Sequence, residues 1–286
     1  MTEPTPPRRC AVIGNPIAHS RSPFIHLRFA EQTGLDLRYD RILAEADDFE
    51  AVATDFFHGG GIGLNVTVPF KEKAFTLTHR RLDDSARVAQ AVNTLYVREG
   101  VLHGANTDGT GLLADLERLG CTLSGKRVLL VGAGGAARGV AAPLLASGCA
   151  LLHVVNRHAE RAHILRQHIH EISPATAGRL SSGGLRDADG DWDLIINATS
   201  GSLQGQAPDI PAARYAAGAL AYDLVYSARP TPFMIQASRL GADQVSDGLG
   251  MLVSQAAASF AIWHGRYPDA LPVLAALRQA LDAETR

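Results

Sequence analysis

The chain has 286 residues, of which 46% are hydrophobic, and it carries 27 Lys and Arg against 29 Asp and Glu, a formal net charge of -2. At roughly 100–200 residues per domain, this length predicts two domains of ordinary globular composition. A nearly neutral balance with scattered Lys and Arg argues against proteins whose affinity depends on neutralising nucleic-acid phosphates or anionic lipids.

Cysteine, histidine and signal patterns restrict the cellular setting. The 3 Cys are odd in number and form no Cys-x-x-Cys pair, which argues against a disulfide framework and a thiolate zinc site. The 11 His are scattered without metal-ligand spacing, so we expect no metal. Residues 1–9 contain no apolar segment of a secretory signal, and the uncharged stretches 139–156 and 248–265 are interrupted by proline or polar residues. We therefore expect a cytoplasmic protein with no membrane span.

The first hundred residues alternate short apolar runs with helical patterns, which is typical of βα units and parallel strands. In chain order, we expect a strand at residues 10–14, a helix at 23–33, a strand at 35–43, a helix at 47–58 and a strand at 62–68. Pro69 ends the last of these strands because it cannot donate to a ladder. Residues 93–97 and 101–103 are typical of a hairpin. This part of the chain is therefore expected to form a mixed sheet.

A second series of βα units follows. Residues 126–131 are typical of a buried strand, and after a glycine-rich turn a helix rich in Ala and Leu runs to about Gly148. We expect further strands at residues 150–155, 193–198 and 219–226, and a helix at 111–119 that joins the two series. The prediction is an α/β protein with two domains, residues 1–109 and 110–247, and an apolar helical tail at 248–286 that packs on the first domain.

The glycine-rich turn carries the pattern Gly132-x-Gly134-x-x-Ala137, which matches the fingerprint of dinucleotide-binding folds. Its glycines give a tight turn and let backbone N–H groups approach a pyrophosphate at a helix N-terminus. The pattern alone is weak, but here it follows a predicted strand and opens a predicted helix. A glycine-rich turn that binds no ligand is the alternative.

The tip of the next strand distinguishes NAD from NADP, because an Asp or Glu there bonds the ribose 2′-hydroxyl and repels a 2′-phosphate. This chain has Asn156 and Arg157 at the tip, with Arg161 four residues later. If a helix begins here, the two arginines share a face and their planar guanidinium groups can clamp a phosphate. The pattern favours NADP, and two solvated arginines at a helix start are the alternative.

A helix-start pattern precedes residue 23. A serine, Ser20 or Ser22, stands at the cap position and Pro23 at the first helical position. Capping is sufficient to explain one of the two serines. Two hydroxyl groups at a helix N-terminus also form a neutral site for an anion such as a carboxylate. The spacing alone leaves both interpretations open.

Two further segments hold polar residues beside predicted strands. Asn65 and Thr67 lie on one face of a strand, and Lys71 follows the break at Pro69. A lysine in that place is usually a solvated surface charge. The segment Asn-Thr-Asp-Gly at residues 106–109 lies at the expected domain junction, where these residue types are usual in a turn. The local patterns alone assign no chemistry to either segment.

Six segments taken together resemble the shikimate dehydrogenase family. They are, in chain order, GNPIAHSRSP (14–23), NVTVPFK (65–71), AVNT (91–94), NTDG (106–109), GAGGA (132–136) and DGLGMLV (247–253). The resemblance spans nearly the whole chain, and the joint occurrence of the six segments is far more specific than any one of them. It implies a substrate domain, residues 1–109 completed by the C-terminal helices at 248–286, an NADP-binding Rossmann domain at 110–247, and a cleft between them. The implied reaction is the reversible NADPH-dependent reduction of 3-dehydroshikimate to shikimate, a step of aromatic amino-acid biosynthesis.

The resemblance also implies roles for individual residues. It makes Lys71 and Asp108 the catalytic pair. It implies substrate contacts from Ser20 and Ser22 to the carboxylate, from Thr67, Asn93 and Gln255 to the ring hydroxyls, and from Tyr226 nearby. It implies cofactor contacts from Gly132, Ala133, Gly134, Gly135 and Ala136 to the pyrophosphate, from Asn156, Arg157 and Arg161 to the 2′-phosphate, and from Leu224 and Gly248 near the nicotinamide. One residue departs from the family: His158 stands where Thr is common, and its imidazole could also donate to the phosphate.

The implied chemistry assigns the protein two tasks. The nicotinamide carries the hydride, so the protein must orient the reacting carbon and manage the proton of the alcohol. An ammonium group near the C3 oxygen donates a proton as the ketone is reduced, and the amine accepts it in the oxidation, which suits Lys71. Burial favours the neutral amine whereas a neighbouring Asp108 carboxylate favours the ammonium, so the sequence does not decide which of the two carries the proton.

Two alternatives share the fold but differ in activity. A quinate/shikimate dehydrogenase would accept the C1-hydroxylated ring and often use NAD, but Arg157 and the lack of an acidic residue at the strand tip argue against it. A catalytically silent paralogue that only binds the nucleotide would not need both Lys71 and Asp108. The expected partners are therefore NADP and a small-molecule substrate, with no nucleic acid or membrane, in a monomer or homodimer that the sequence does not distinguish.

Overall fold

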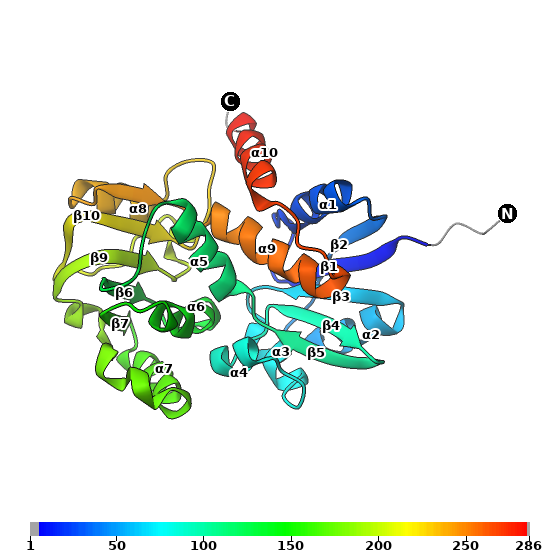
Figure 1. The fold of residues 1–286 in the computed structure, drawn as a ribbon, viewed down its shortest axis with the longest axis horizontal. Coiled ribbons are helices and arrows are strands. Elements are labelled where there is room, and N and C mark those ends of the chain that lie inside the picture. Colours follow the sequence, from blue (N-terminus) through cyan, green and yellow to red (C-terminus); the bar gives the residue numbers. More distant parts are fainter. Residues whose placement is uncertain (1–5, 285–286) are drawn as a thin grey trace. The chain divides into compact units, whose positions relative to one another are not determined.

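The computed structural model describes residues 6–284, and within them the chain divides into two compact units (Figure 1). The first unit runs to Thr107 and includes Val253–Leu277, and the second spans Asp108–Leu252 and continues from Arg278. Residues 1–5 and 285–286, at the outer ends of the predicted domain ranges, lie outside the described residues.

The first unit is built on a mixed sheet. Its strands are β1 (Arg8–Gly14), β2 (Leu37–Leu43), β3 (Gly61–Val66), β4 (Thr94–Arg98) and β5 (Val101–Ala105), in the spatial order β2-β1-β3-β4-β5. β1 is parallel to β2 and β3, whereas β3, β4 and β5 pair antiparallel. The helices in this part of the chain are α1 (Ser22–Thr33), α2 (Phe49–His58), α3 (Lys71–Leu77) and α4 (Asp84–Ala89). The predicted mixed sheet and its hairpin are confirmed.

Burial on both faces explains why β1 is apolar from Cys10 to Ile13. Ala11 and Ile13 belong to the same buried cluster as Phe49 of α2. Successive side chains of a strand point to opposite faces, so Cys10 and Val12, which are equally buried, pack on the other face. A strand covered on both sides carries a continuous apolar run rather than an alternating pattern.

The second unit is built on a parallel sheet. Its strands are β6 (Arg127–Val131), β7 (Leu151–Asn156), β8 (Leu180–Gly184), β9 (Gly190–Asn197), β10 (Ala213–Asp223) and β11 (Gln244–Ser246), in the order β11-β10-β9-β6-β7-β8. All of these strand pairs are parallel. The helices here are α5 (Asp108–Arg118), α6 (Gly135–Ala146), α7 (Ala159–Ile172) and α8 (Pro232–Arg239), with short 3-10 turns at Pro174–Arg179, Leu185–Asp187 and Gly201–Gln204. This strand order is the doubly wound one, and its switch point, where ligands of such folds bind, lies between β6 and β9.

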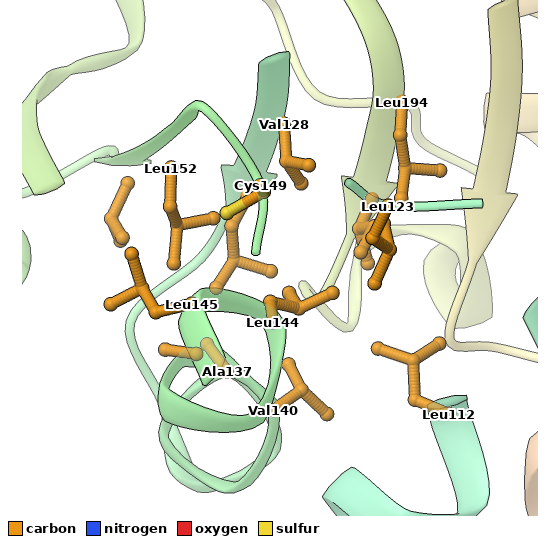
Figure 2. Close-up of a cluster of buried hydrophobic side chains, with 14 of the residues drawn as sticks. Leu112, Leu123, Val128, Ala137, Val140, Leu144, Leu145, Cys149, Leu152 and Leu194 are labelled. Carbon is orange, nitrogen blue, oxygen red and sulfur yellow. The ribbon is translucent and has the colours of Figure 1, made fainter. Parts of the chain in front are cut away.

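Two apolar clusters cover the two faces of the parallel sheet. Val128 of β6 packs in one cluster with Leu144 of α6 (Figure 2), and Leu130 belongs to the same cluster. The intervening Leu129 and Val131 belong to the other cluster, with aromatic side chains from β9 and α8. The buried run predicted at residues 126–131 is therefore a central strand that is covered on both faces.

The two C-terminal helices are α9 (Leu249–His264) and α10 (Ala270–Ala283). The uncharged stretch at residues 248–265 forms α9, and the one at 139–156 is divided between α6 and β7, in agreement with the prediction. No helix within residues 6–284 is long and apolar enough to cross a membrane.

Candidate active site

Ser20 and Ser22 form a hydroxyl pair at the start of α1. Ser20 Oγ lies 3.2 Å from Ser22 Oγ and accepts a hydrogen bond from the Ser22 backbone N–H at 3.3 Å. The Ser20 carbonyl accepts two hydrogen bonds from the Arg41 guanidinium group, at 2.9 and 2.7 Å. The predicted serine at the N-cap position is wrong, because the N-cap residue is Arg21, whose side chain makes no capping hydrogen bond. The Ser22 side chain also hydrogen-bonds Tyr39. A pair of hydroxyl groups at a helix N-terminus suits a carboxylate.

Lys71 is anchored by its backbone rather than placed on a loose surface loop. It begins α3, directly after Phe70, whose fully buried ring stacks on Phe49 with a centroid distance of 4.8 Å. The Phe70 N–H donates to the Thr67 carbonyl at 2.9 Å, and the Lys71 carbonyl accepts from the Val92 N–H at 2.9 Å. The half-buried Lys71 side chain thus has a defined origin beside the segment that carries Asn93.

Two predicted substrate contacts that are distant in sequence meet in the first unit. Asn93 Nδ2 donates to Gln255 Oε1 at 3.3 Å, across a separation of 162 residues. Thr67 lies at the end of β3, beside Gly14 of β1. A Cβ built on Gly14 would lie 2.5 Å from Thr67 Cγ2, so a glycine is needed there to leave room for the threonine.

The segment at residues 106–109 is more than a turn, because its residues make specific hydrogen bonds, begin a helix or permit two helices to pack closely. Asn106 Nδ2 donates to the Ala91 carbonyl at 2.9 Å, and the Thr107 N–H donates to Asn93 Oδ1 at 2.9 Å. Asp108, only 4% exposed, is the first residue of α5 in the second unit. A Cβ on the next residue, Gly109, would lie 2.3 Å from a side-chain carbon of α6, so the glycine permits the two helices to pack.

The glycine-rich turn after β6 fits a pyrophosphate. Gly132 has φ +120°, a conformation that other residues rarely adopt, and its N–H donates to the Val155 carbonyl at 2.7 Å. Gly134 is the N-cap of α6 and has φ -85°, which any residue can adopt. A Cβ on Gly134 would meet no heavy atom within 4 Å. Neither backbone strain nor protein packing requires a glycine at that position, so the open space in front of the helix N-terminus is suited to a close-approaching anion.

The strand-tip arginines lie at the N-terminus of α7. Asn156 ends β7 and its Nδ2 donates to the His158 carbonyl at 3.0 Å. The helix begins at Ala159, because His158 has an extended backbone (φ -103°, ψ 96°). Arg157 therefore lies outside the helix, and the expectation that it shares a helical face with Arg161 is wrong. Both side chains are exposed at this helix end, whose dipole also favours an anion.

Asp223, at the end of β10, organises the segment that carries Leu224 and Tyr226. Its carboxylate accepts four hydrogen bonds, from Ser202 Oγ and Thr231 Oγ1 at 2.6 Å and from Asn197 Nδ2 and the Val225 N–H at 3.1 Å. Burial raises the pKa of Asp223, and these donors oppose that rise because they stabilise the carboxylate. The hydrogen bonds of the buried Asp223 carboxylate thus hold the segment after β10 in place. Tyr226, three residues later, is half-buried.

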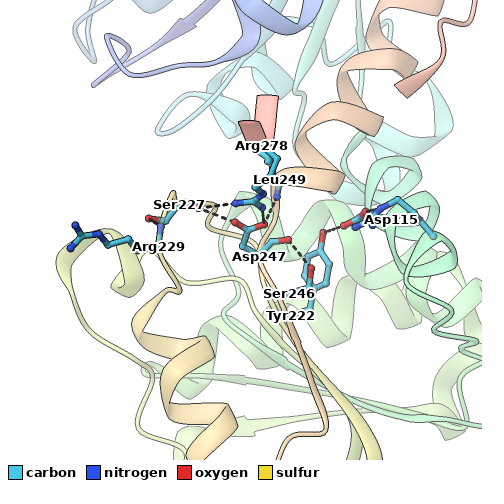
Figure 3. A network of polar contacts seen from close by, with 9 residues as sticks. Asp115, Tyr222, Ser227, Arg229, Ser246, Asp247, Leu249 and Arg278 are labelled. Atoms are coloured by element: carbon cyan, nitrogen blue, oxygen red, sulfur yellow. Dashed lines mark hydrogen bonds and ion pairs between the residues drawn. The ribbon is translucent and has the colours of Figure 1, made fainter. Parts of the chain in front are cut away.

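Asp247 holds the turn that precedes α9 (Figure 3). Its carboxylate accepts from the Leu249 N–H at 3.2 Å, from the Ser227 N–H at 3.3 Å and from Arg278 at 2.6 Å. Arg278 also donates to the Ser227 carbonyl at 3.0 Å. These bonds connect the turn around Gly248 with the segment after β10 and with α10. The Gly248 N–H also donates to the Val225 carbonyl at 3.2 Å.

Sequence reasoning missed these supports. The four side chains concerned are Asn197, Asp223, Asp247 and Arg278. Asp223 lies inside the apolar run predicted as a strand at residues 219–226, and Asp247 directly precedes the predicted helical tail at 248–286, so an acidic residue within or beside an apolar run was the available signal. Four of their partners, Asn197, Ser202, Ser227 and Arg278, are 20 to 31 residues away, so local spacing does not reveal them.

Comparisons with known proteins agree with this geometry. Three family profiles match: the shikimate dehydrogenase substrate binding domain at residues 12–95, shikimate / quinate 5-dehydrogenase at 115–204, and the shikimate 5′-dehydrogenase C-terminal domain at 248–278. The chain is 55% identical over 286 residues to the shikimate dehydrogenase (NADP(+)) of Bordetella petrii, covering 99% of this chain and 100% of that protein. It is 57% identical over 284 residues to that of Bordetella avium, with the same coverage, 99% and 100%. The chain belongs to the shikimate dehydrogenase family.

A solved member of the family has the same fold. The shikimate 5-dehydrogenase from Thermus thermophilus, in complex with NADP(H) and shikimate, superimposes with a TM-score of 0.83 at 33% identity, covering 96% of this chain and 100% of that one. The resemblance inferred from the six segments is confirmed. Asp108, Leu224 and Tyr226 lie outside the three matched profile ranges.

Proposed function

We propose that this protein is an NADP-dependent shikimate dehydrogenase, which reversibly reduces 3-dehydroshikimate to shikimate. The observation that carries the proposal is the 55% identity over 99% of the chain to a shikimate dehydrogenase (NADP(+)). The chain also has Lys71 and Asp108 in the segments that resemble the family. The proposed place in metabolism is aromatic amino-acid biosynthesis, and a cytoplasmic location stays a prediction.

The first unit is proposed to hold the substrate. Ser20 and Ser22 offer hydroxyl donors to the carboxylate without a counter-charge. Asn93 and Gln255, with Thr67, are proposed to bind the ring hydroxyls, and Tyr226 of the second unit is proposed to lie near the ring. The mutual hydrogen bond of Asn93 and Gln255 supports their joint use, because a single hydroxyl can meet both amides.

The second unit is proposed to hold NADP. The open N-terminus of α6, at residues 132–136, fits the pyrophosphate, and Asn156, Arg157 and Arg161 at the start of α7 fit the 2′-phosphate. Leu224 and Gly248 are proposed to meet the nicotinamide end. The bound cofactor supplies or accepts the hydride, which is chemistry that no side chain offers.

Proton transfer is the chemical task left to the chain. Lys71 is proposed to donate a proton to the C3 oxygen as the ketone becomes an alcohol, and to accept it in the reverse direction. Asp108 is proposed to hold the Lys71 ammonium and to share its proton. Both residues begin a helix, so their backbones are defined by regular structure rather than by a loop.

One assay tests the proposal. The purified protein is mixed with shikimate and NADP, and NADPH formation is followed by absorbance; the same assay is repeated with quinate and with NAD. We expect turnover with shikimate and NADP and much weaker activity with either replacement. Comparable activity with quinate or NAD would favour a quinate/shikimate dehydrogenase, and no activity with any pair would favour a nucleotide-binding paralogue without catalysis.

A further inference from the structure

A series of buried hydrogen bonds leads to Asn93 within the first unit. The Tyr39 hydroxyl donates to Asn65 Oδ1 at 2.7 Å, and Asn65 Nδ2 donates to Ser259 Oγ at 3.0 Å. Ser259 Oγ lies 2.7 Å from Thr94 Oγ1, which donates to Asn93 Oδ1 at 2.8 Å. All five residues are at most 6% exposed. Solvent therefore does not replace a lost partner, and each broken bond leaves a buried polar atom unsatisfied.

Backbone groups define the orientation of the two amides. Asn65 Nδ2 faces the Asn93 carbonyl at 3.4 Å, and a carbonyl only accepts, so the nitrogen of Asn65 must lie on that side. Asn93 Oδ1 faces the Thr107 backbone N–H at 2.9 Å, and an N–H only donates, so the oxygen of Asn93 must lie there. Both assignments are independent of how the hydroxyl groups rotate.

Two hydroxyls, those of Thr94 and Ser259, connect these amides. Thr94 Oγ1 lies 2.8 Å from Asn93 Oδ1, which only accepts. Thr94 and Ser259 are joined by a 2.7 Å contact in which either hydroxyl can donate, because Ser259 also has the Gln255 carbonyl as an acceptor at 3.1 Å. On its other side, Ser259 Oγ accepts from Asn65 Nδ2. Ser259 is thus the group through which Asn65 and Tyr39 act on the Asn93 amide.

The same arrangement reaches Gln255. Ser259 follows Gln255 by one helical turn on α9, and its Oγ lies 3.1 Å from the Gln255 carbonyl. Asn93 Nδ2 and Thr107 Oγ1 both face Gln255 Oε1 at 3.3 Å. With the oxygen of Asn93 held toward Thr94 and the Thr107 N–H, its nitrogen is turned to the Gln255 amide oxygen. The two side chains proposed to bind the ring hydroxyls therefore share one defined arrangement.

We propose that Ser259 is a positioning residue for substrate binding. Its hydroxyl holds the Asn93 amide, and through it the Gln255 amide, in the orientation that meets the ring hydroxyls of shikimate. The proposal rests on the proposed function, since it takes Asn93 and Gln255 as substrate contacts. Removal of the hydroxyl would take one partner from Thr94 and would leave Asn65 Nδ2 with only the longer bond to the Asn93 carbonyl. The Asn93 amide, still held by the Thr107 N–H, would be held less firmly in its orientation.

Three variants of Ser259 separate the hydroxyl from the volume of the side chain. Ser259→Ala removes the oxygen, Ser259→Cys keeps nearly the same shape but is a weak hydrogen-bond partner, and Ser259→Thr retains a hydroxyl. We expect the KM and Kd for shikimate to rise about tenfold in the first two variants, the order of effect of one unsatisfied buried donor. The KM for NADP should stay unchanged, and Ser259→Thr should recover most of the shikimate affinity.

Thr33→Val is the matched control. Thr33 is a half-buried residue of α1 whose hydroxyl donates to the Phe29 carbonyl four residues before it at 2.8 Å, as the Ser259 hydroxyl lies near the carbonyl four residues before it. Loss of the Thr33 hydroxyl removes the same kind of bond within a helix and should leave the KM for shikimate unchanged. A Ser259→Ala enzyme with wild-type shikimate affinity would overturn the proposal. So would equal losses of affinity for shikimate and NADP, which indicate general damage.

A measurement on the free protein keeps the two proposals distinguishable. The side-chain amide signals of Asn93 are assigned in the nitrogen-proton correlation spectrum by their loss in Asn93→Asp. We expect these signals to shift or broaden in Ser259→Ala and to stay in place in Thr33→Val, whatever the protein's substrate. If the wild-type protein does not oxidise shikimate, the proposed function fails while this spectrum still decides whether Ser259 orients Asn93; unchanged Asn93 signals would refute the positioning role.

Discussion

Gly248 lies directly against the carbonyl group of Leu224: a Cβ built on Gly248 would come within 2.3 Å of the Leu224 oxygen and 2.7 Å of its carbonyl carbon. Both residues are proposed to meet the nicotinamide end of the cofactor, although they are 24 positions apart in sequence. The contact explains why the turn that Asp247 holds requires a glycine: no side chain fits between two backbone segments at this distance.

Gly248→Ala is therefore expected to impair cofactor binding. The atoms in the way are backbone atoms, which cannot rotate aside, so the alanine must displace the segment after β10 or the turn before α9. We expect the KM for NADP to rise and the melting temperature to fall by several degrees, in line with a backbone shift costing roughly 1–3 kcal/mol. Gly178→Ala is the control, because a Cβ there would meet no heavy atom within 4 Å and the backbone is not left-handed. Wild-type KM and stability in Gly248→Ala would contradict this account of the contact.

Arg157→Ala is expected to act on NADP alone. Arg157 is exposed beside the N-terminus of α7, so its charge-assisted hydrogen bonds form only when a 2′-phosphate is present. The KM for NADP should rise roughly tenfold or more, with the KM for NAD nearly unchanged. Arg166→Ala, which removes an exposed arginine further along the same helix, serves as the control. Equal losses for both cofactors would show that Arg157 is structural.

The central strands of both sheets could be predicted because burial on both faces produces continuous apolar runs, as in β1 and β6. Two strands of the parallel sheet could not. β8 has the sequence LSSGG and β11 has three residues, and both lie at an edge of the sheet. Their pairing is decided by β7 and β10, their neighbours, rather than by their own side chains.

The residues of the candidate site could be predicted from local sequence segments, but the side chains that hold those residues in place could not. The segments around Ser22 and Lys71 carry polar residues at places where a helix begins, so they were visible along the chain. Local spacing misled at Arg157, because the helix begins two residues later than the arginine pair suggested. Ser259 was invisible for a different reason: its partners Asn65 and Thr94 are 194 and 165 residues away, and only the folded chain brings them together.

Ser22→Ala is expected to weaken shikimate binding while sparing NADP binding. Ser22 is the first residue of α1 and not its N-cap, so loss of its hydroxyl does not remove a helix cap, which would cost about 1 kcal/mol. The KM for shikimate should rise, since one donor to the carboxylate is lost, and the melting temperature without ligand should fall only modestly, since the buried Ser22 hydroxyl also bonds Tyr39. A clear fall in melting temperature with an unchanged KM for shikimate would assign Ser22 a structural role instead.

Two histidines, the fully buried His26 and the half-buried His264, are expected to make the protein acid-sensitive. Burial lowers the pKa of His26 to about 3 and that of His264 to about 4. Between the unfolded value of about 6.5 and these folded values, the unfolded chain binds more protons, so the free energy of unfolding falls as the pH falls. The fully buried His26 alone contributes a slope of up to about 1.4 kcal/mol per pH unit in this window.

Urea unfolding at pH 7.5, 6 and 5 measures this dependence. His26 stacks on Tyr39 at a centroid distance of 4.4 Å, so His26→Phe retains an aromatic ring and removes the titration. The variant should lose less stability than the wild type between pH 6 and 5. His79→Phe, at an exposed position, should keep the wild-type slope. Identical slopes in the wild type and His26→Phe would exclude His26 as the source.

Lys71→Ala is expected to lose most of kcat while retaining much of the affinity for shikimate, because the proposed role of the amine is proton transfer at C3. General acid-base catalysis typically contributes about 10²–10⁴-fold, and a fall of that order is expected. Lys73→Ala is a matched control on the same helix: the Lys73 ammonium is exposed and donates to the Ala46 carbonyl, away from the proposed chemistry. Its kcat should stay near that of the wild type.

Asp108→Asn tests whether the two groups work as one unit. The substitution keeps the shape of the buried side chain but removes the charge that is proposed to hold the Lys71 ammonium, so turnover should also slow. If the residues form one unit, the double variant should be little slower than Lys71→Ala, whereas independent roles would multiply the two losses. Steady-state kcat of the four proteins, measured with saturating shikimate and NADP, completes the cycle. A Lys71→Ala enzyme that turns over at nearly the wild-type rate would refute the proposed proton transfer, even with the family membership established.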